Sequence, residues 1–398
     1  MAWRWSALPT HGTAPAPRTA FASALFDGAL IIAGGWDRST AFDDMHALNL
    51  KTASWQAVPA FSPSPFANRI LFAHASVEGS IYVHGGTSAD NMGAVRDDLF
   101  RIDVAEERWE ALATEGDGPG SVARHSMAAM GGSLWCFGGW DGGSFLEGAF
   151  RLRLGHTSSP AAGAVWERLE VRGLAPHARA HASLVPAPWS HHLLLFGGGD
   201  ADYDFGDLYA LDVQTLRWKR FDAQSGGPAL SQPGYALLPE RGGSGSLAIH
   251  GGFGGGAESE PTRQDAFHLL PLLPPDDGRH VRAGRWASPR ALGEPPVARM
   301  GHALLAVNES CLLVFGGNAD RSIAYSGDHL NDVIVAVPER DPADRGDEDG
   351  GIAPRADGGG EDEVIVRTSR VGGTRGRPPH KKKRRRPSRP SDAVKEEL

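Results

Sequence analysis

The sequence LLLFGG at residues 193–198, an apolar run closed by two glycines, decides the fold because it recurs along the chain. The matching runs are LIIAGG (30–35), IYVHGG (81–86), LWCFGG (134–139), LAIHGG (247–252) and LLVFGG (312–317). Their first glycines are 51, 53, 59, 54 and 65 residues apart. A repeat of about fifty residues has the size of a propeller blade, so the sequence predicts six blades.

Other strand-like segments surround each glycine pair. An apolar stretch precedes it, and a second strand, often led by Asp, follows it, as in DDLFRIDV and GDLYALDV. A tryptophan then follows in five units, at Trp55, Trp109, Trp166, Trp218 and Trp286. The glycines allow sharp turns with positive φ, and each tryptophan is expected to form a large apolar plate between neighbouring blades.

This order of strands, glycine pair and tryptophan resembles the kelch repeat, and the resemblance covers residues 1–338. It implies an all-β, six-bladed kelch-type β-propeller with four-stranded blades. The sixth unit is not followed by a tryptophan-bearing strand. Residues 2–8 (AWRWSAL) resemble such a strand but precede the first unit. We therefore expect the N-terminal strand to complete the last blade, which leaves no open sheet edge at the junction.

Composition and charge divide the chain in two. Residues 1–338 carry 25 basic and 35 acidic side chains, whereas residues 339–398 carry 15 and 13. Residues 339–363 of this tail are acidic, and residues 364–391 hold eleven bases and no acid. Such a composition buries too little apolar surface to fold, so the tail is predicted to be disordered.

Two motifs in the tail suggest where the protein acts. A basic cluster consists of Lys381, Lys382, Lys383, Arg384, Arg385 and Arg386. Such a cluster is typical of a nuclear-import signal or a nucleic-acid-binding patch. Arg375, Gly376, Arg377 and Pro378 resemble the core of an AT-hook, which implies contact with the A·T minor groove of DNA. The alternative is a solvated basic tail that serves import alone.

The remaining bulk features predict a monomeric propeller in the nucleus, the cytoplasm or both. There is no apolar run of 18 residues and no leader-like N-terminal stretch, so no membrane contact is expected. Cys136 and Cys311 lie in apolar runs, where thiols are usually small buried side chains.

Five arginines recur before the first strand of a unit and are the predicted partner-binding residues: Arg18, Arg69, Arg124, Arg179 and Arg299. In a kelch propeller this position lies near one mouth of the central channel, where convergent guanidinium groups favour carboxylates or phosphates. The alternative is structural: the arginines pair with acids of the neighbouring blade, such as Asp37, Asp90, Asp141 or Asp200.

No catalytic motif occurs in its required context, so the sequence predicts a non-enzymatic interaction module without a cofactor. Its predicted partner is a protein or peptide that binds at the channel mouth of this adaptor or substrate-recognition platform, and the arginines there would favour an anionic peptide. One alternative function, which resembles that of an enzyme, remains open. Glu260, Gln264 and His268 are similar to the iron motif of nitrile-specifier proteins, which are kelch propellers, but Gln replaces the middle Asp. That reading implies an iron-dependent protein acting on a small molecule.

Overall fold

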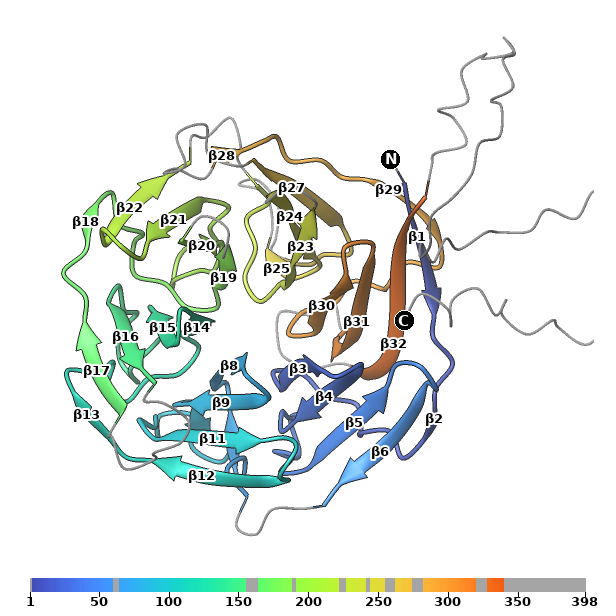
Figure 1. The fold of residues 1–398 in the computed structure, drawn as a ribbon, viewed down its shortest axis with the longest axis horizontal. Coiled ribbons are helices and arrows are strands. Elements are labelled where there is room, and N and C mark those ends of the chain that lie inside the picture. Colours follow the sequence, from blue (N-terminus) through green and yellow to red (C-terminus); the bar gives the residue numbers. More distant parts are fainter. Residues whose placement is uncertain are drawn as a thin grey trace, which may run out of the picture.

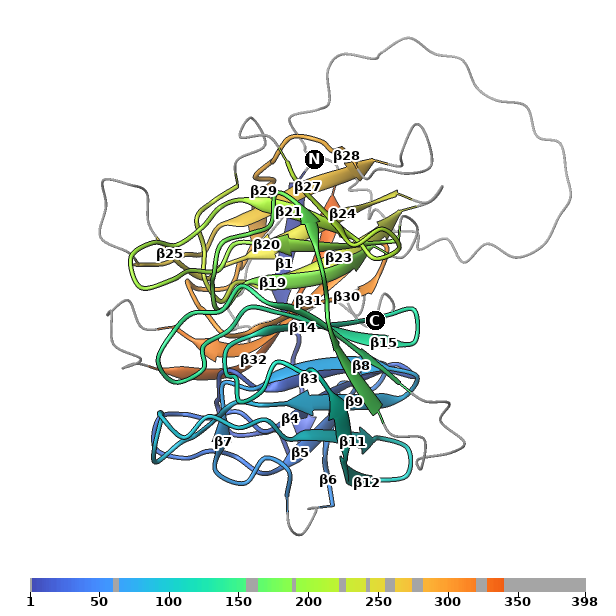
Figure 2. The same cartoon turned by 90° about the vertical axis from the view of Figure 1, so that its left-hand side faces the viewer.

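The computed structural model is a ring of six β-sheet blades around a central channel (Figure 1). It describes residues 2–59, 64–154, 164–187, 191–221, 227–240, 244–254, 262–273, 282–319 and 328–339. Seen from the side (Figure 2), blades 1 and 2 lie at the bottom of the view and blade 5 near the top. The innermost strands of all six blades face the channel, so residues at the start of these strands are candidates for a binding site.

The first three blades are built from the following strands, given from the channel outward. Blade 1 contains β3 (Ala22–Phe26), β4 (Ala29–Ala33), β5 (Met45–Asn49) and β6 (Ser54–Val58). Blade 2 contains β8 (Ala73–Val77), β9 (Ser80–His84), β11 (Leu99–Asp103) and β12 (Arg108–Leu112). Blade 3 contains β14 (Ser126–Met130), β15 (Ser133–Phe137), β16 (Ala149–Arg153) and β17 (Ala164–Arg168).

The other three blades follow the same order. Blade 4 contains β19 (Ser183–Ala187), β20 (His192–Phe196), β21 (Leu208–Asp212) and β22 (Arg217–Arg220). Blade 5 contains β23 (Gly234–Glu240), β24 (Ser244–His250), β27 (Phe267–Leu273) and β28 (Arg282–Ala283). Blade 6 contains β30 (Ala303–Asn308), β31 (Cys311–Asn318), β32 (His329–Glu339) and β1 (Ala2–Ala7). Two short ribbons, β7 (Arg69–Ile70) with β10 (Thr87–Ser88) and β25 (Phe253–Gly254) with β26 (Thr262–Arg263), lie outside these sheets. The predicted all-β, six-bladed fold is therefore confirmed.

The N-terminal strand closes the ring as predicted. β1 pairs with β32 in antiparallel register from Ala2 opposite Glu339 to Ala7 opposite Ile334. Trp3 and Trp5 of this strand are 3% and 1% exposed, because they pack against Phe267 of blade 5. The two ends of the propeller thus hold one blade together, and the hydrophobic contacts of β1 connect that blade to its neighbour.

The periodic tryptophans pack between blades, also as predicted. Five tryptophans contact the residue just before the glycine pair of the preceding blade: Trp55 with Phe315, Trp166 with His84, Trp218 with Phe137, Trp286 with Phe196, and Trp5 with His250. Trp109 instead contacts the ring of Phe100 in its own blade. Both faces of the second strand in each blade are therefore covered. This explains why β9, β15 and β20 are buried along their whole length.

A feature not predicted from the sequence is an extra strand on the outer edge of four blades. These strands pair in parallel with the outermost strand of the blade that the chain enters next: β2 (His11–Gly12) with β6, β13 (Thr114–Gly116) with β17, β18 (Arg172–Gly173) with β22, and β29 (Arg290–Gly293) with β1. We call them edge strands. In the described part of the chain no edge strand lies beside β12 of blade 2 or β28 of blade 5.

The last described strand, β32, ends at Glu339, and the predicted boundary at residue 338 stays a prediction because the residues after Glu339 lie outside the described part of the chain. The tail motifs at residues 375–378 and 381–386 lie outside the described residues, so they stay predictions. In the described residues we find no helix with the length and apolar character needed to cross a membrane.

Candidate functional site

Four of the five predicted arginines form buried ion pairs inside their own blades. The side chains of Arg18, Arg69, Arg179 and Arg299 are at most 1% exposed. Each guanidinium group binds both carboxylate oxygens of the aspartate that leads the third strand: Asp44, Asp98, Asp207 and Asp332, respectively. In the Arg69 pair, the two N–H···O distances are 2.6 and 2.7 Å.

The same guanidinium groups also hold the glycine turn. Nη1 of Arg69 donates to the carbonyl oxygen of Gly85, and Arg18, Arg179 and Arg299 donate to Gly34, Gly197 and Gly316 in the same way. Burial alone would raise the pKa of Asp98, but the hydrogen bonds and charge of Arg69 hold that pKa below its ordinary value. The four arginines are therefore structural parts of the blades, and the expected ring of solvent-facing guanidinium groups is not formed by them.

The arginines do pair with aspartates, as the structural alternative expected, but with aspartates of the same blade and not with those predicted. Asp37, Asp141 and Asp200 accept hydrogen bonds from main-chain N–H groups of their own loops. Asp90 accepts a hydrogen bond from the Asn68 side chain. The pairing occurs within a blade because the arginine and the strand-leading aspartate both lie beside the glycine turn.

Arg124 differs from the other four because it occupies a different position in its blade. Its main chain is left-handed, and so are those of the residues at the same position in the other blades. The six residues and their φ angles are Ala20 (52°), Leu71 (55°), Arg124 (59°), His181 (59°), Gln232 (52°) and Gly301 (61°). The position of Arg18 and its three equivalents is taken in blade 3 by Val122.

Five main-chain hydrogen bonds connect these six residues in a series around the channel. The N–H of Arg124 donates to Leu71 O at 2.8 Å, and the N–H of His181 donates to Arg124 O at 2.9 Å. The pattern continues through Gln232, Gly301 and Ala20 at 3.3, 3.0 and 3.0 Å. This series of hydrogen bonds holds strained left-handed residues in place and therefore fixes where the Arg124 side chain begins.

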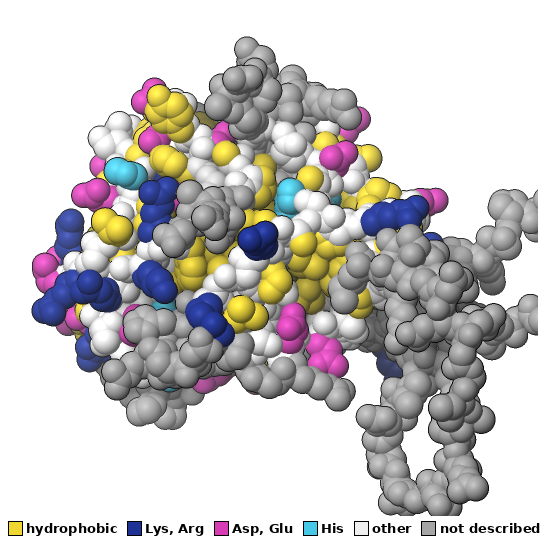
Figure 3. Space-filling view, turned by 90° about the horizontal axis from the view of Figure 1, so that it is seen from above, with side chains coloured by type: hydrophobic (Ala, Val, Ile, Leu, Met, Phe, Trp, Pro, Cys, Tyr) yellow, Lys and Arg dark blue, Asp and Glu magenta, His cyan; other side chains and the backbone are white. Residues whose placement is uncertain are grey.

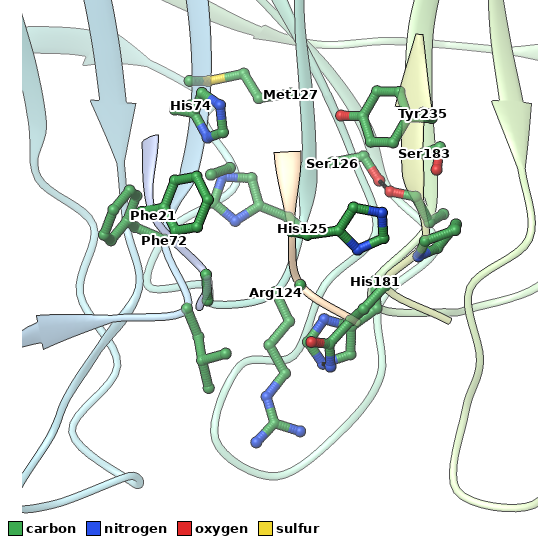
Figure 4. Close-up of a pocket in the computed structure, with 18 residues that line it drawn as sticks. Phe21, Phe72, His74, Arg124, His125, Ser126, Met127, His181, Ser183 and Tyr235 are labelled. Carbon is green, nitrogen blue, oxygen red and sulfur yellow. Dashed lines mark hydrogen bonds between the residues drawn. The ribbon is translucent and has the colours of Figure 1, made fainter. Parts of the chain in front are cut away.

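The channel has two chemically different ends. Arg124 and His181 lie together where the innermost strands begin, whereas Met127 and Tyr235 lie toward the other end (Figure 4). We call the Arg124 end the channel mouth. Phe21, Phe72 and His74 line the same cavity.

Arg124 is a cation without a carboxylate partner. It forms no ion pair within the described residues, and the described residues that line the cavity include no Asp or Glu. Its Nε is buried without a hydrogen-bond partner, and its guanidinium carbon lies 5.4 Å from the centre of the Trp140 ring. Burial and the Arg124 charge lower the pKa of His181 to about 3, so this neighbour is neutral at physiological pH.

Two histidine pairs also lie between blades. Nε2 of His125 lies 3.0 Å from Nδ1 of His84, and Nε2 of His302 lies 3.1 Å from Nδ1 of His250. Burial lowers the pKa of all four imidazoles, to about 4 for His84 and about 3 for His250. His125 and His302 line the channel, so the cavity wall is neutral apart from Arg124.

The residues of the iron alternative are only partly described. Gln264 donates its amide N–H to Gly254 O at 2.8 Å, and Nδ1 of His268 lies 3.0 Å from Ser288 Oγ. Glu260 lies outside the described residues. Among the residues that are described, no three His, Cys, Asp or Glu side chains are grouped as metal ligands would be.

Sequence reasoning missed the distinction between Arg124 and the other arginines, although a signal was present. Each edge strand ends in glycine, followed three residues later by proline: Gly12 and Pro15, Gly116 and Pro119, Gly173 and Pro176, Gly293 and Pro296. The buried arginine stands six residues after the glycine in three cases. Counting from Gly116 leads to Val122, which shows that Arg124 is out of register.

Comparison with known proteins gives the family. A family model described as the KLHDC2/KLHL20/DRC7 Kelch-repeats domain matches residues 1–139 and 72–252. The chain is 27% identical over 354 residues to acyl-CoA-binding domain-containing protein 4 of Arabidopsis thaliana, covering 84% of this chain and 47% of the relative. It is 26% identical over 265 residues to human Kelch domain-containing protein 10, covering 62% of this chain and 55% of the relative.

Two further matches agree with these. The Rab9 effector protein with kelch motifs of Mus musculus is 27% identical over 212 residues, which cover 51% of this chain and 53% of the relative. The chain spans about half the length of these curated relatives. Among solved structures, that of YjhT superposes with a TM-score of 0.60 at 18% identity and covers 83% of this chain and 97% of its own. The matched residues include most of the propeller, and the chain therefore belongs to the kelch-repeat family.

Proposed function

We propose that this propeller is a protein-interaction module whose channel mouth binds an anionic segment of a partner through Arg124. The observation that carries the proposal is the uncompensated charge of Arg124 in a cavity whose described lining is otherwise neutral. The kelch fold and the kelch relatives support an interaction module in general. One of these relatives, from Mus musculus, is named as a Rab9 effector.

The chemistry favours a carboxylate or a phosphate. A guanidinium group presents several N–H donors in one plane, and it pairs with such groups through two parallel hydrogen bonds. Arg124 Nε is buried and has no acceptor, so a bound anion would satisfy it. Trp140 supports the guanidinium group from one side, which leaves the N–H groups oriented along the ring plane.

A peptide-binding measurement tests the proposal. The probe is a fluorescein-labelled octaglutamate peptide, and its anisotropy is followed on titration with protein. Residues 381–386 are changed to alanine in every sample, because that basic cluster would attract the same peptide. Arg124→Ala is expected to weaken binding at least tenfold, Arg124→Lys less, and added salt should weaken binding in the parent chain.

The matched control is Arg172→Ala, which removes an exposed arginine on the outer rim, remote from the described channel lining. It should leave the affinity unchanged. Equal affinity of the Arg124→Ala variant and its parent, with equal thermal stability, would refute the role of Arg124.

A further inference from the structure

The channel cavity has a second group of polar side chains, which lies beyond the mouth. Tyr235 and His74 stand three residues further along the chain than Gln232 and Leu71 of the hydrogen-bonded series at the mouth, which is roughly 10 Å in a strand. In Figure 4 the hydroxyl of Tyr235 points toward the side of the cavity where His74 and Met127 lie. No described residue forms a hydrogen bond with this hydroxyl, so it is available to a ligand.

His74 offers a hydrogen-bond donor, because its tautomer is fixed. The main-chain N–H of Ser23 donates to Nε2 of His74 at 3.2 Å, so Nε2 carries the lone pair and Nδ1 carries the hydrogen atom. Burial lowers the pKa of His74 to about 4, so the ring is neutral at physiological pH. Within the described part of the chain, Nδ1 donates to no acceptor. His74 therefore brings a neutral N–H donor to the cavity.

Ser183, the first residue of β19, adds a third polar group. Its side chain lines the same cavity as Tyr235 (Figure 4). Ser183 is 1% exposed, and its Oγ is buried without a hydrogen-bond partner. Because an unpaired buried hydroxyl is unfavourable, a ligand that pairs with it gains affinity.

The size and charge of the cavity restrict that ligand to one neutral side chain. The cavity has a volume of about 160 Å³, and a protein cavity of about 150 Å³ accommodates one benzene molecule. Phe21 and Phe72 provide apolar walls, which suit the methylene groups of a side chain. The described lining contains no Asp or Glu, so a cationic group would be buried there without a counter-charge.

The polar groups favour a tip that both accepts and donates hydrogen bonds. His74 can only donate, whereas the hydroxyls of Tyr235 and Ser183 can also accept. A primary carboxamide is neutral and combines one oxygen acceptor with two N–H donors. Glutamine suits the depth of these groups better than asparagine, because its side chain is one methylene longer.

We propose that the channel binds a glutamine side chain of the partner segment whose anionic residue pairs with Arg124. The carboxamide oxygen accepts from Nδ1 of His74, and the amide N–H groups donate to the hydroxyls of Tyr235 and Ser183. This selectivity rests on the function proposed for Arg124 and adds a second recognised side chain to it.

Two labelled peptides test the proposal by fluorescence anisotropy. One is octaglutamate with its fifth residue changed to glutamine, and the other has leucine there, so the two peptides have equal charge. Residues 381–386 are again changed to alanine in every sample. The glutamine peptide should bind about tenfold more tightly, because leucine leaves the polar groups of the cavity unpaired.

Tyr235→Phe removes only a hydroxyl group and should reduce this preference to about threefold. The matched control is Tyr82→Phe. Tyr82 lies in β9, outside the described lining of the cavity, so this variant should keep the full preference.

Equal affinity of the two peptides for the parent chain would overturn the proposal, and so would tighter binding of the leucine peptide. If Arg124→Ala still weakened both peptides, the role of Arg124 would stand while the glutamine site would be disproved. If neither peptide bound, both proposals would be contradicted. A full preference in the Tyr235→Phe variant would also contradict the site, because the glutamine would then be recognised elsewhere.

Discussion

At the scale of single residues, the arginines of this propeller show how the same side chain serves two purposes. A guanidinium group can be buried when a carboxylate and carbonyl oxygens satisfy its donors, as for Arg179 with Asp207 and Gly197. Two residues out of that register, Arg124 cannot reach such partners and extends into the channel instead. The function proposed for Arg124 thus depends on a shift in register.

Replacing Asp207 with alanine tests the structural role. Asp207 is 12% exposed and Arg179 is fully buried, so the variant leaves a buried charge without its partner. We expect a loss of about 3–5 kcal/mol in the free energy of unfolding, the usual result of breaking a buried ion pair. Urea denaturation measures it, with Arg124→Ala as the control that should lose less than about 1 kcal/mol. Similar losses in both variants would contradict the distinction.

The buried histidines predict that stability falls in mild acid. The pKa of His181 is about 3 in the folded protein, against 6.5 ordinarily, so between these values only the unfolded chain binds the proton. Stability therefore decreases as pH falls below 6.5, by about 1.4 kcal/mol per pH unit for each such histidine at most. Gln232 occupies the same position in blade 5 with a similar φ, so His181→Gln should fold.

Urea denaturation between pH 5 and 7 measures this dependence. The His181→Gln variant should show a slope that is shallower by up to about 1.4 kcal/mol per pH unit. An unchanged slope would mean that His181 takes up its proton while the protein is folded.

At the scale of strands and blades, the sequence predicted what repeats and missed what varies. The glycine pairs and tryptophans recur because every blade needs the same turn and the same large apolar side chain to pack against its neighbour. The distance from arginine to glycine pair is 16 residues for Arg18, 18 for Arg179 and 14 for Arg124. The loop between the first two strands is longer in blade 4 than in blade 1, so this distance varies among the buried arginines too and did not by itself identify Arg124 as out of register. The edge strands are only two to four residues long and lack the alternation that identifies a strand.

The closing strand gives a prediction at this scale. Deleting residues 2–9 removes β1, exposes the edge of β32 and takes Trp3 and Trp5 out of the core. The variant should unfold at a much lower temperature than the full chain, whereas deletion of residues 340–398 should change the melting temperature far less. Trp5→Ala alone should cost about 3–5 kcal/mol, as is usual for a buried tryptophan. Calorimetry checks all three, and equal melting temperatures for both deletions would disprove closure by β1.

At the scale of the whole molecule, charge separates the propeller from the tail. The propeller sequence is net acidic at −10, and residues 364–391 carry eleven bases without an acid. An acidic domain does not bind nucleic acid through its overall charge, so any contact with DNA is assigned to the tail.

The last prediction concerns that basic segment. Fused to a fluorescent reporter, residues 364–398 should carry it into nuclei, and changing residues 381–386 to alanine should leave it in the cytoplasm. Changing Arg375 and Arg377 should leave import intact and weaken only DNA binding. Affinity for DNA should fall steeply with salt, because each neutralised phosphate releases counterions. At equal salt it should be higher for A·T tracts, whose narrow minor groove attracts arginine. A cytoplasmic reporter would disprove nuclear import, and equal affinity for A·T and G·C duplexes would remove the groove contact while leaving import in place.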